Sequence, residues 1–248
     1  MSRNFELIQQ LEIVSLVEAR EAFEPDFAQL EQLEVDVGNR EWASDEALSL
    51  VQRVFLPQTQ TSPRAVVFTG VNHGDGCTGI CASVADTLAR NGYGPVCLVE
   101  ANFRSPSLSG IFGMSNRHGL ADALLRDGPI RPFVKPAGSD GLWLLPCGGN
   151  ATKWPNLVGC ERIKPRLDEL RNEFRFVLID TPPLTHAADA VTMGQLTHGV
   201  VLVLEAASTR RESAQMATAT LRSAKVPILG AVLNKRTFPI PDAIYKRI

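Results

Sequence analysis

The segment Phe68–Ala89, FTGVNHGDGCTGICASVADTLA, decides the fold of this 248-residue chain. Apolar and β-branched residues from Ala65 to Thr69 lead into it, a composition typical of a buried strand. Gly74 and Gly76 follow, and the residues after them have the composition of a helix. Glycines between a buried strand and a helix permit a tight turn, so the segment predicts a strand–loop–helix unit.

The rest of the chain repeats this alternation of short apolar runs and helix-like stretches. The expected strands are residues 64–70, 95–101, 141–147, 174–180, 199–206 and 226–234. The expected helices are residues 44–56, 78–91, 119–127, 160–173, 187–197 and 209–224. Nearly continuous apolar strands between helices indicate an α/β fold, a doubly wound and mainly parallel sheet with helices on both faces. Ligands of such sheets bind beyond the carboxyl ends of the strands.

The glycine-rich loop has the layout of a phosphate-binding loop without its lysine. In such a loop, glycine amides face phosphate oxygens, a lysine contacts the β- and γ-phosphates, and a serine or threonine hydroxyl binds Mg²⁺. Here Gly74, Asp75 and Gly76 supply the backbone and Thr78 supplies the hydroxyl. Cys77 stands where lysine is expected. On its own, the loop also fits a glycine-rich turn that binds nothing.

Polar residues close three other predicted strands. Asp180 could hold Mg²⁺ near the loop, or cap a turn. Glu100 and Asn102 alternate at another strand end, where carboxylates bind metal or activate a hydroxyl, and Arg104 after them is a candidate phosphate contact. Asn234 either reads an adenine edge or terminates the last strand.

The five cysteines have irregular spacing and form no CxxC pair, which argues against a zinc site or a disulfide framework. Buried, reduced thiols are the general expectation. Cys77 differs because it lies at a predicted helix N-terminus, a position that lowers a thiol's pKa. The hypothesis is that Cys77 is a redox- or alkylation-sensitive residue.

Charge is distributed unevenly along the chain. Residues 1–46 hold twelve acidic and three basic residues, whereas the remainder holds 15 acidic and 22 basic ones. An acidic segment, residues 1–43, partly helical or disordered, is therefore expected before a domain of residues 44–248. No apolar run approaches the roughly 20 residues of a membrane span. The first residues mix charged and apolar groups too early for a signal peptide, so a cytoplasmic protein is expected.

Six segments, taken in order, resemble the kinase domain of bacterial tyrosine kinases of polysaccharide export. These kinases are a branch of the deviant P-loop ATPases that includes the Min-type and Par-type proteins. The similar region runs from about residue 46 to residue 248. Its segments are VEANFRSPSL, GLADALLRDG, LPCGGNATKWPNLVGCER, FRFVLIDTPPL, ADAVTMGQLTHGVVLVLEAASTRRESA and GAVLNKRTFPIPDAIYKRI.

This resemblance implies a P-loop NTPase-like fold, binding of ATP or ADP with Mg²⁺, and tyrosine autophosphorylation between subunits. It also implies a membrane-embedded regulator of polysaccharide chain length as partner, a homo-oligomer, and a cytoplasmic location peripheral to the inner membrane; no nucleic-acid partner is expected. By position, residues 74–78 match the Walker A loop, and Glu100 and Asn102 match the Walker A′ aspartates. Asp180 matches the Walker B aspartate and Asn234 the contact to the base. Thr78, Glu100 and Asp180 would hold the metal.

The departures from the family pattern fall on the chemistry. The Walker A lysine is Cys77, and the two Walker A′ aspartates are Glu100 and Asn102. Loss of one preorganised charge typically costs about 3–4 kcal/mol, on the order of 10²–10³ in rate. Binding of ATP and Mg²⁺ is therefore expected to be weak or absent.

Two further family features are missing. The chain has two tyrosines, Tyr93 and Tyr245, and no terminal tyrosine cluster. The oligomer motif E-x-x-R-x-x-R would begin near Glu46, but Ser49 and Gln52 stand at its arginine positions. The leading hypothesis is a degenerate kinase-like protein that regulates capsular or exopolysaccharide biosynthesis or export. The alternatives are an active autokinase that uses substitute residues and a Min- or Par-like positioning ATPase.

Overall fold

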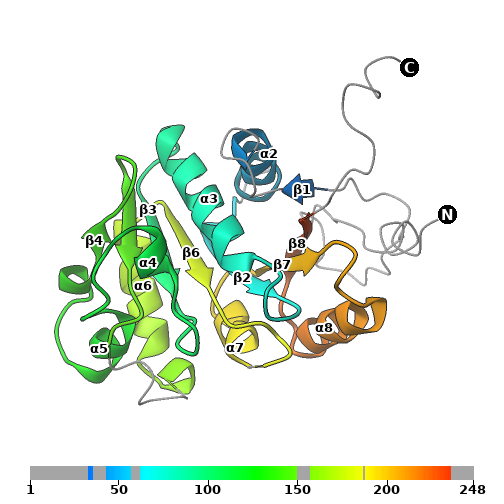
Figure 1. Ribbon diagram of the computed structural model, residues 1–248. Helices are drawn as coiled ribbons and strands as arrows, with labels where there is room; N and C mark the ends of the chain where they lie inside the picture. The colour runs from blue at the N-terminus through cyan, green and yellow to red at the C-terminus, as the bar shows by residue number, and fades with distance from the viewer. Residues whose placement is uncertain (1–32, 36–42, 57–61, 150–156, 187, 236–248) are drawn as a thin grey trace.

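A central sheet organises the computed structural model, which describes residues 33–35, 43–56, 62–149, 157–186 and 188–235. Within these residues, eight strands pair in the order β1-β8-β7-β2-β6-β3-β5-β4 (Figure 1). β4 is antiparallel to β5, and the other pairings are parallel. The predicted doubly wound, mainly parallel α/β fold is confirmed.

Each predicted strand and helix is present, with ends within three residues of the expected ones. The strands are β1 (Leu33–Val35), β2 (Ala65–Gly70), β3 (Val96–Glu100), β4 (Lys135–Pro136), β5 (Leu142–Leu145), β6 (Phe176–Asp180), β7 (Val200–Glu205) and β8 (Ile228–Asn234). The α-helices are α2 (Ala43–Phe55), α3 (Cys77–Arg90), α4 (Leu108–Ile111), α5 (Leu120–Leu125), α6 (Ile163–Glu173), α7 (Asp189–Gln195) and α8 (Arg211–Ser223). Short 3₁₀ turns cover Arg131–Phe133 and Leu157–Gly159.

The sheet is buried on both faces, which explains its continuous apolar strands. All six residues of β2 are buried, and successive side chains face opposite ways. Val66 and Phe68 pack with α2 and α3, whereas Val67 packs in the core that holds α5, α6 and α7. α2 and α3 therefore cover one face, and α5 to α8 cover the other (Figure 1).

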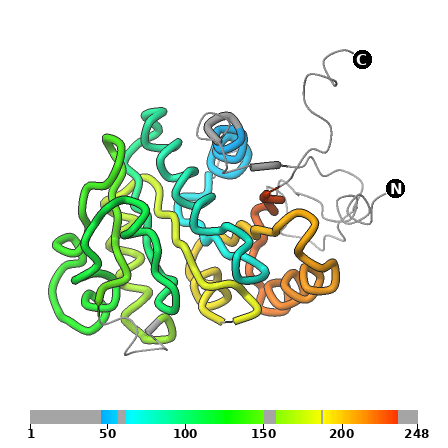
Figure 2. Tube along the Cα trace, in the orientation of Figure 1, coloured from blue at the N-terminus to red at the C-terminus, as the bar shows by residue number. Residues whose placement is uncertain are grey.

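The strand order places the ends of several strands at one edge of the sheet. β2 lies between β6 and β7, and β3 lies beyond β6. Because β2, β3, β6, β7 and β8 are parallel, their carboxyl ends share that edge. In Figure 2 the cyan loop after β2 approaches the yellow and orange segments that follow β6 and β7. This edge is where a doubly wound sheet binds its ligand.

The N-terminal segment contributes one strand that its sequence did not predict. β1 pairs in parallel with β8, although no strand was expected among residues 1–43. The remaining residues of that segment, apart from Ala43, and also Tyr245, lie outside the described residues, so the domain boundary stays a prediction. Among the described residues, no helix combines the length and apolarity needed to cross a membrane.

Candidate functional site

The loop between β2 and α3 depends on its glycines. Gly76 precedes α3 in the left-handed region, at φ 85°. A Cβ atom there would lie 2.1 Å from Nδ2 of Asn234, so a side chain cannot be accommodated. Gly74 also has a positive φ, 94°, but a Cβ there would meet no atom within 4 Å. The loop is therefore closely packed at Gly76 and open at Gly74.

Three hydrogen bonds fix this loop in place. The buried Asp75 carboxylate accepts from the backbone N–H of Asn72 at 2.7 Å and from the hydroxyl of Thr209 at 3.3 Å. The side-chain amide of Asn234 donates to the Asp75 carbonyl at 2.9 Å. Burial raises the pKa of Asp75. Through these contacts the loop is attached to β8 and to the connection between β7 and α8.

Asp180 and Thr78 lie together at the predicted metal position. Asp180 is 1% exposed, and the Thr78 hydroxyl donates to its Oδ2 at 2.8 Å. Its Oδ1 is buried and has no hydrogen-bond partner among the described residues. Burial, with a smaller contribution from Glu100, raises the pKa of Asp180 to about 7, although hydrogen bonds from Thr78 and Cys77 lower it. Asp180 thus keeps one oxygen available beside the loop.

The Cys77 thiol is neutral, contrary to the prediction of a lowered pKa. Cys77 is half-buried at the first position of α3, and its thiol lies beside the Asp180 carboxylate. Burial and the neighbouring Asp180 carboxylate raise its pKa well above the ordinary value. The prediction was wrong because desolvation and a nearby anion outweigh the positive end of the helix. A protonated thiol adds no positive charge to the loop.

Glu100 has all of its hydrogen-bonding capacity engaged by the protein. It is 0% exposed, and its Oε1 accepts the backbone N–H groups of Ser107 and Leu108, both at 2.6 Å. Its Oε2 accepts from the Ser109 hydroxyl at 3.4 Å and from the Cys147 N–H at 3.3 Å. The carboxylate therefore joins the start of α4 to the segment after β5.

Asn102 and Arg104 are turned to local partners. Oδ1 of Asn102 accepts the N–H of Ser105 at 3.2 Å, which closes a turn. Arg104 is exposed and lies near Asp189 at the start of α7, where its charge opposes the burial that raises the Asp189 pKa. Within the described ranges, neither side chain hydrogen-bonds to the loop of residues 74–78.

Lys235 is a site residue that the sequence reasoning missed. Its Nζ lies 2.7 Å from the Gly74 carbonyl oxygen and 3.2 Å from Oε1 of Glu205. Its φ is 58°, an uncommon conformation for a residue other than glycine. The signal available in the sequence was its place directly after Asn234, at the exit of a strand that ends beside the loop.

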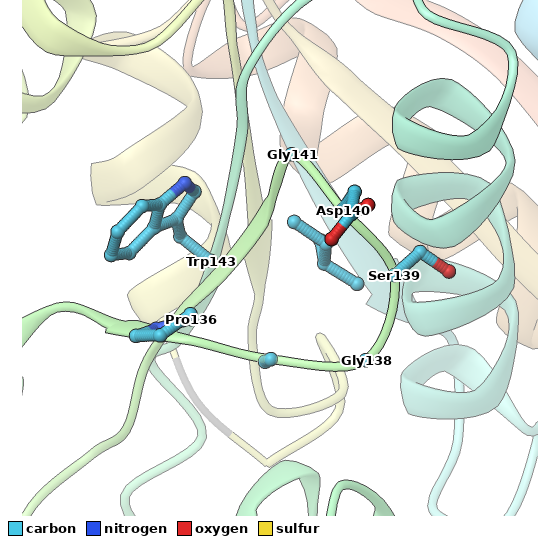
Figure 3. Close-up of a pocket in the computed structure, with 8 residues that line it drawn as sticks. Pro136, Gly138, Ser139, Asp140, Gly141 and Trp143 are labelled. Carbon is cyan, nitrogen blue, oxygen red and sulfur yellow. The ribbon is translucent and has the colours of Figure 1, made fainter.

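A pocket elsewhere in the molecule does not include the predicted site residues. It is lined by residues 136–143 of the β4–β5 hairpin, including Asp140 and Trp143 (Figure 3). The hairpin is at the edge of the sheet, away from β2. None of the residues that line it was a predicted site residue, and none belongs to the loop of residues 74–78.

The loop residues fit a nucleotide with Mg²⁺ in part. The Thr78 hydroxyl and the unpaired Oδ1 of Asp180 are oxygen donors of the kind that Mg²⁺ prefers. Oδ1 of Asn234 is likewise buried without a partner in the described part of the chain, and it could accept from a base. Cys77 does not fit, because a neutral thiol cannot balance phosphate charge.

Sequence comparison places bacterial kinases among the homologues of the chain. No protein-family model matches it. The putative tyrosine-protein kinase CapB of Staphylococcus aureus is 24% identical over 77% of this chain and 84% of its own length. The tyrosine-protein kinase YwqD of Bacillus subtilis is 29% identical over 69% of this chain and 72% of its own length.

Solved structures share the fold. The kinase domain of Escherichia coli tyrosine kinase ETK has a TM-score of 0.71 and 21% identity, covering 81% of this chain and 79% of that one. The septum site-determining protein MinD of Pyrococcus horikoshii has a TM-score of 0.59 and 20% identity, covering 74% and 76%. The expected resemblance is confirmed: the homologues are bacterial tyrosine-protein kinases, and the structural neighbours include their kinase domains and Min-type ATPases.

Proposed function

We propose that this chain, a homologue of bacterial tyrosine-protein kinases, is a degenerate kinase-like protein with a regulatory role in capsular or exopolysaccharide biosynthesis or export. It binds a nucleotide weakly at the loop of residues 74–78, and its ATP hydrolysis and phosphotransfer are lost or weakened. The observation that carries this proposal is the position of Cys77 at the start of α3 beside Asp180, where the family pattern requires a lysine.

The chemistry follows from the charges at the loop. A bound Mg²⁺ would offset negative charge on the phosphates, and Thr78 and Asp180 are the residues to hold it. The transferred phosphoryl group also needs a fixed cation on its other oxygens, and Cys77 supplies none. Loss of such a group is worth about 3–4 kcal/mol of the barrier, on the order of 10²–10³ in rate. We therefore expect the chain to bind a nucleotide even though its catalytic activity is lost or weakened.

A membrane-embedded regulator of polysaccharide chain length is the proposed partner, with the chain at the inner membrane through that partner. The relative named tyrosine-protein kinase wzc, from Salmonella typhi, matches 80% of this chain over only 28% of its own length. We infer this partner from the likeness of the chain to tyrosine-protein kinases such as wzc. Self-association of this chain is part of the same proposal.

A phosphotransfer assay with radiolabelled γ-phosphate tests the catalytic part. Cys77→Lys restores a cation to the loop, so we expect it to transfer phosphate about 100-fold faster than the unaltered chain. Cys160→Lys, which places lysine on another half-buried cysteine, should leave the rate unchanged. If the unaltered chain already transfers phosphate as fast as Cys77→Lys, it is an active kinase that uses substitute residues.

Genetic complementation tests the regulatory part. Deletion of the gene should lower the polysaccharide yield of the cell, and the unaltered chain should restore it. Asp180→Asn removes the carboxylate proposed to hold Mg²⁺, and it should restore the yield too if catalysis is not required. Failure of Asp180→Asn at equal protein level would favour the active kinase, and an unchanged yield on deletion would exclude the polysaccharide role.

A further inference from the structure

We propose that Lys235 supplies the cation that the loop lacks at Cys77, by contacting the phosphate groups of a nucleotide bound there. This inference rests on the nucleotide binding proposed above. It makes Lys235 a binding residue of the same site, contributed by the end of β8 and not by the loop itself. Lys235 belongs neither to the loop motif nor to the candidate residues at the strand ends.

The position of the ammonium group is the first support. Nζ of Lys235 donates to the Gly74 carbonyl at 2.7 Å, so a positive charge lies against the loop. Gly74 is also the open side of the loop, where a Cβ would meet no atom within 4 Å. A phosphate that contacts the loop at Gly74 would therefore meet this ammonium first.

The number of donors is the second support. A lysine ammonium has three N–H donors, and Lys235 uses two of them on the Gly74 carbonyl and the Glu205 carboxylate. The third donor is left for a phosphate oxygen. Lys235 is also about half exposed, so its charge is accessible to a ligand.

Charge balance around the loop is the third support. Asp75, Asp180 and Glu205 all lie near it, and Cys77 brings no compensating charge. A nucleotide carries several negative charges, so its approach to these carboxylates would be opposed. The Lys235 ammonium at Gly74, which also pairs with Glu205, offsets part of this repulsion from the protein side.

The backbone before Lys235 holds it in this place. Asn234, the preceding residue, is bonded to the Asp75 carbonyl and packs on Gly76. Lys235 then adopts φ 58°, a conformation that is strained for a non-glycine residue and persists where surrounding contacts hold it. Lys225 has a similar φ of 56° at the end of α8, so this conformation alone does not mark a site. The contact with Gly74 does.

Calorimetric titration of the full chain with ATP and Mg²⁺ is the direct test. Lys235→Gln removes the charge and keeps a polar side chain that is one bond shorter, and we expect it to weaken ATP binding about tenfold, since hydrogen bonds between charged groups are the strong ones. Lys235→Arg should recover most of the affinity. Lys225→Gln removes a lysine of the same conformation and exposure elsewhere, and it should stay within twofold of the unaltered chain.

The same substitution in the Cys77→Lys variant tests whether the effect depends on the charge that the loop lacks. In Cys77→Lys the loop has its own cation, so adding Lys235→Gln should cost much less than tenfold. An equal loss of ATP affinity in the unaltered chain and in Cys77→Lys would contradict the proposal that Lys235 replaces the missing charge. Thermal unfolding by circular dichroism should show that each variant is folded.

The outcomes separate this inference from the proposed function. If the unaltered chain binds ATP and Lys235→Gln binds it equally well, the role of Lys235 is excluded and weak nucleotide binding stands. If the unaltered chain binds no ATP, both nucleotide binding and the role of Lys235 are excluded. The complementation experiment decides the regulatory role in either case.

Discussion

Glu100 and Asp180 are neighbouring carboxylates with opposite surroundings. They lie in register at the ends of the paired strands β3 and β6, and both are buried. Glu100 accepts four hydrogen bonds from the described residues, whereas Asp180 accepts one from Thr78 through Oδ2, lies beside the Cys77 thiol and keeps Oδ1 unpaired. The two acids occupy equivalent strand positions but differ in their hydrogen bonds: Glu100 is fully engaged by the fold, and Asp180 keeps a buried, unpaired oxygen.

The difference originates in the chain that follows each strand. After β3 the chain returns at residues 107–109 and presents its N–H groups to Glu100, which fixes the start of α4. After β6, no backbone N–H of the described residues bonds to the Asp180 carboxylate, which lies beside Thr78 and Cys77 of α3. A carboxylate at a strand end is therefore catalytic, metal-binding or structural according to which backbone amides reach it.

Glu100→Ala should produce the largest loss of stability. It leaves the buried N–H groups of Leu108 and Cys147 without an acceptor. Each such group costs about 1–3 kcal/mol, so we expect the free energy of unfolding to fall by about 3–4 kcal/mol in a urea titration. Glu161→Ala on the surface should change it by less than about 0.5 kcal/mol. A loss as small as that of Glu161→Ala would contradict the structural role of Glu100.

The pH dependence of stability should show how much the ionisation of the buried Asp180 affects folding. Its pKa is about 7 in the folded chain and 3.8 as the reference for an unfolded one. Between these values the folded state binds more protons, so stability falls as the pH rises through this interval. Each pKa unit is worth about 1.4 kcal/mol, so Asp180 alone should lower the free energy of unfolding by about 2–3 kcal/mol between pH 5 and pH 8.

Asp180→Asn tests this origin, because the amide does not titrate. The variant should lack the part of the decline in stability that Asp180 causes. Its free energy of unfolding, relative to that of the unaltered chain, should therefore increase with pH. Asp140→Asn, an exposed position on the β4–β5 hairpin, should follow the unaltered chain at every pH. A parallel decline in Asp180→Asn would mean that other groups cause the pH dependence.

The sequence was sufficient for the sheet but not for the roles at its edge. Buried parallel strands have a continuous apolar pattern, so β2 and β6 could be located to within two residues. β1 and β4 have three and two residues and carry no such pattern. Thr78 and Asp180 were placed together by motif spacing, and the structure brings them within a hydrogen bond.

What the sequence could not provide were contacts made across the fold. The engagement of Glu100 depends on a turn seven residues further on and on Cys147, which no local pattern reveals. The neutral Cys77 depends on burial beside Asp180, and the contact of Lys235 depends on a backbone conformation that favours glycine. Each of these is a tertiary property, so residue type and spacing gave the location of the site without its charges.

Thr78→Val should have the smallest effect and test the asymmetry most closely. Valine keeps the shape of threonine but removes the donor to Asp180, a bond worth about 0.5–1.5 kcal/mol with a neutral acceptor and about 1.5–3 kcal/mol with a charged one. Because the lost bond favours the charged carboxylate, the pKa of Asp180 should rise, and the loss of unfolding free energy should be greater at pH 8 than at pH 5. Thr87→Val, on the same helix, removes a hydroxyl bonded to the Ser83 carbonyl, so its effect should be equal at both pH values. If Thr78→Val were also independent of pH, its hydroxyl would not be supporting a charged Asp180, and the proposed metal position beside the loop would lose its second oxygen donor.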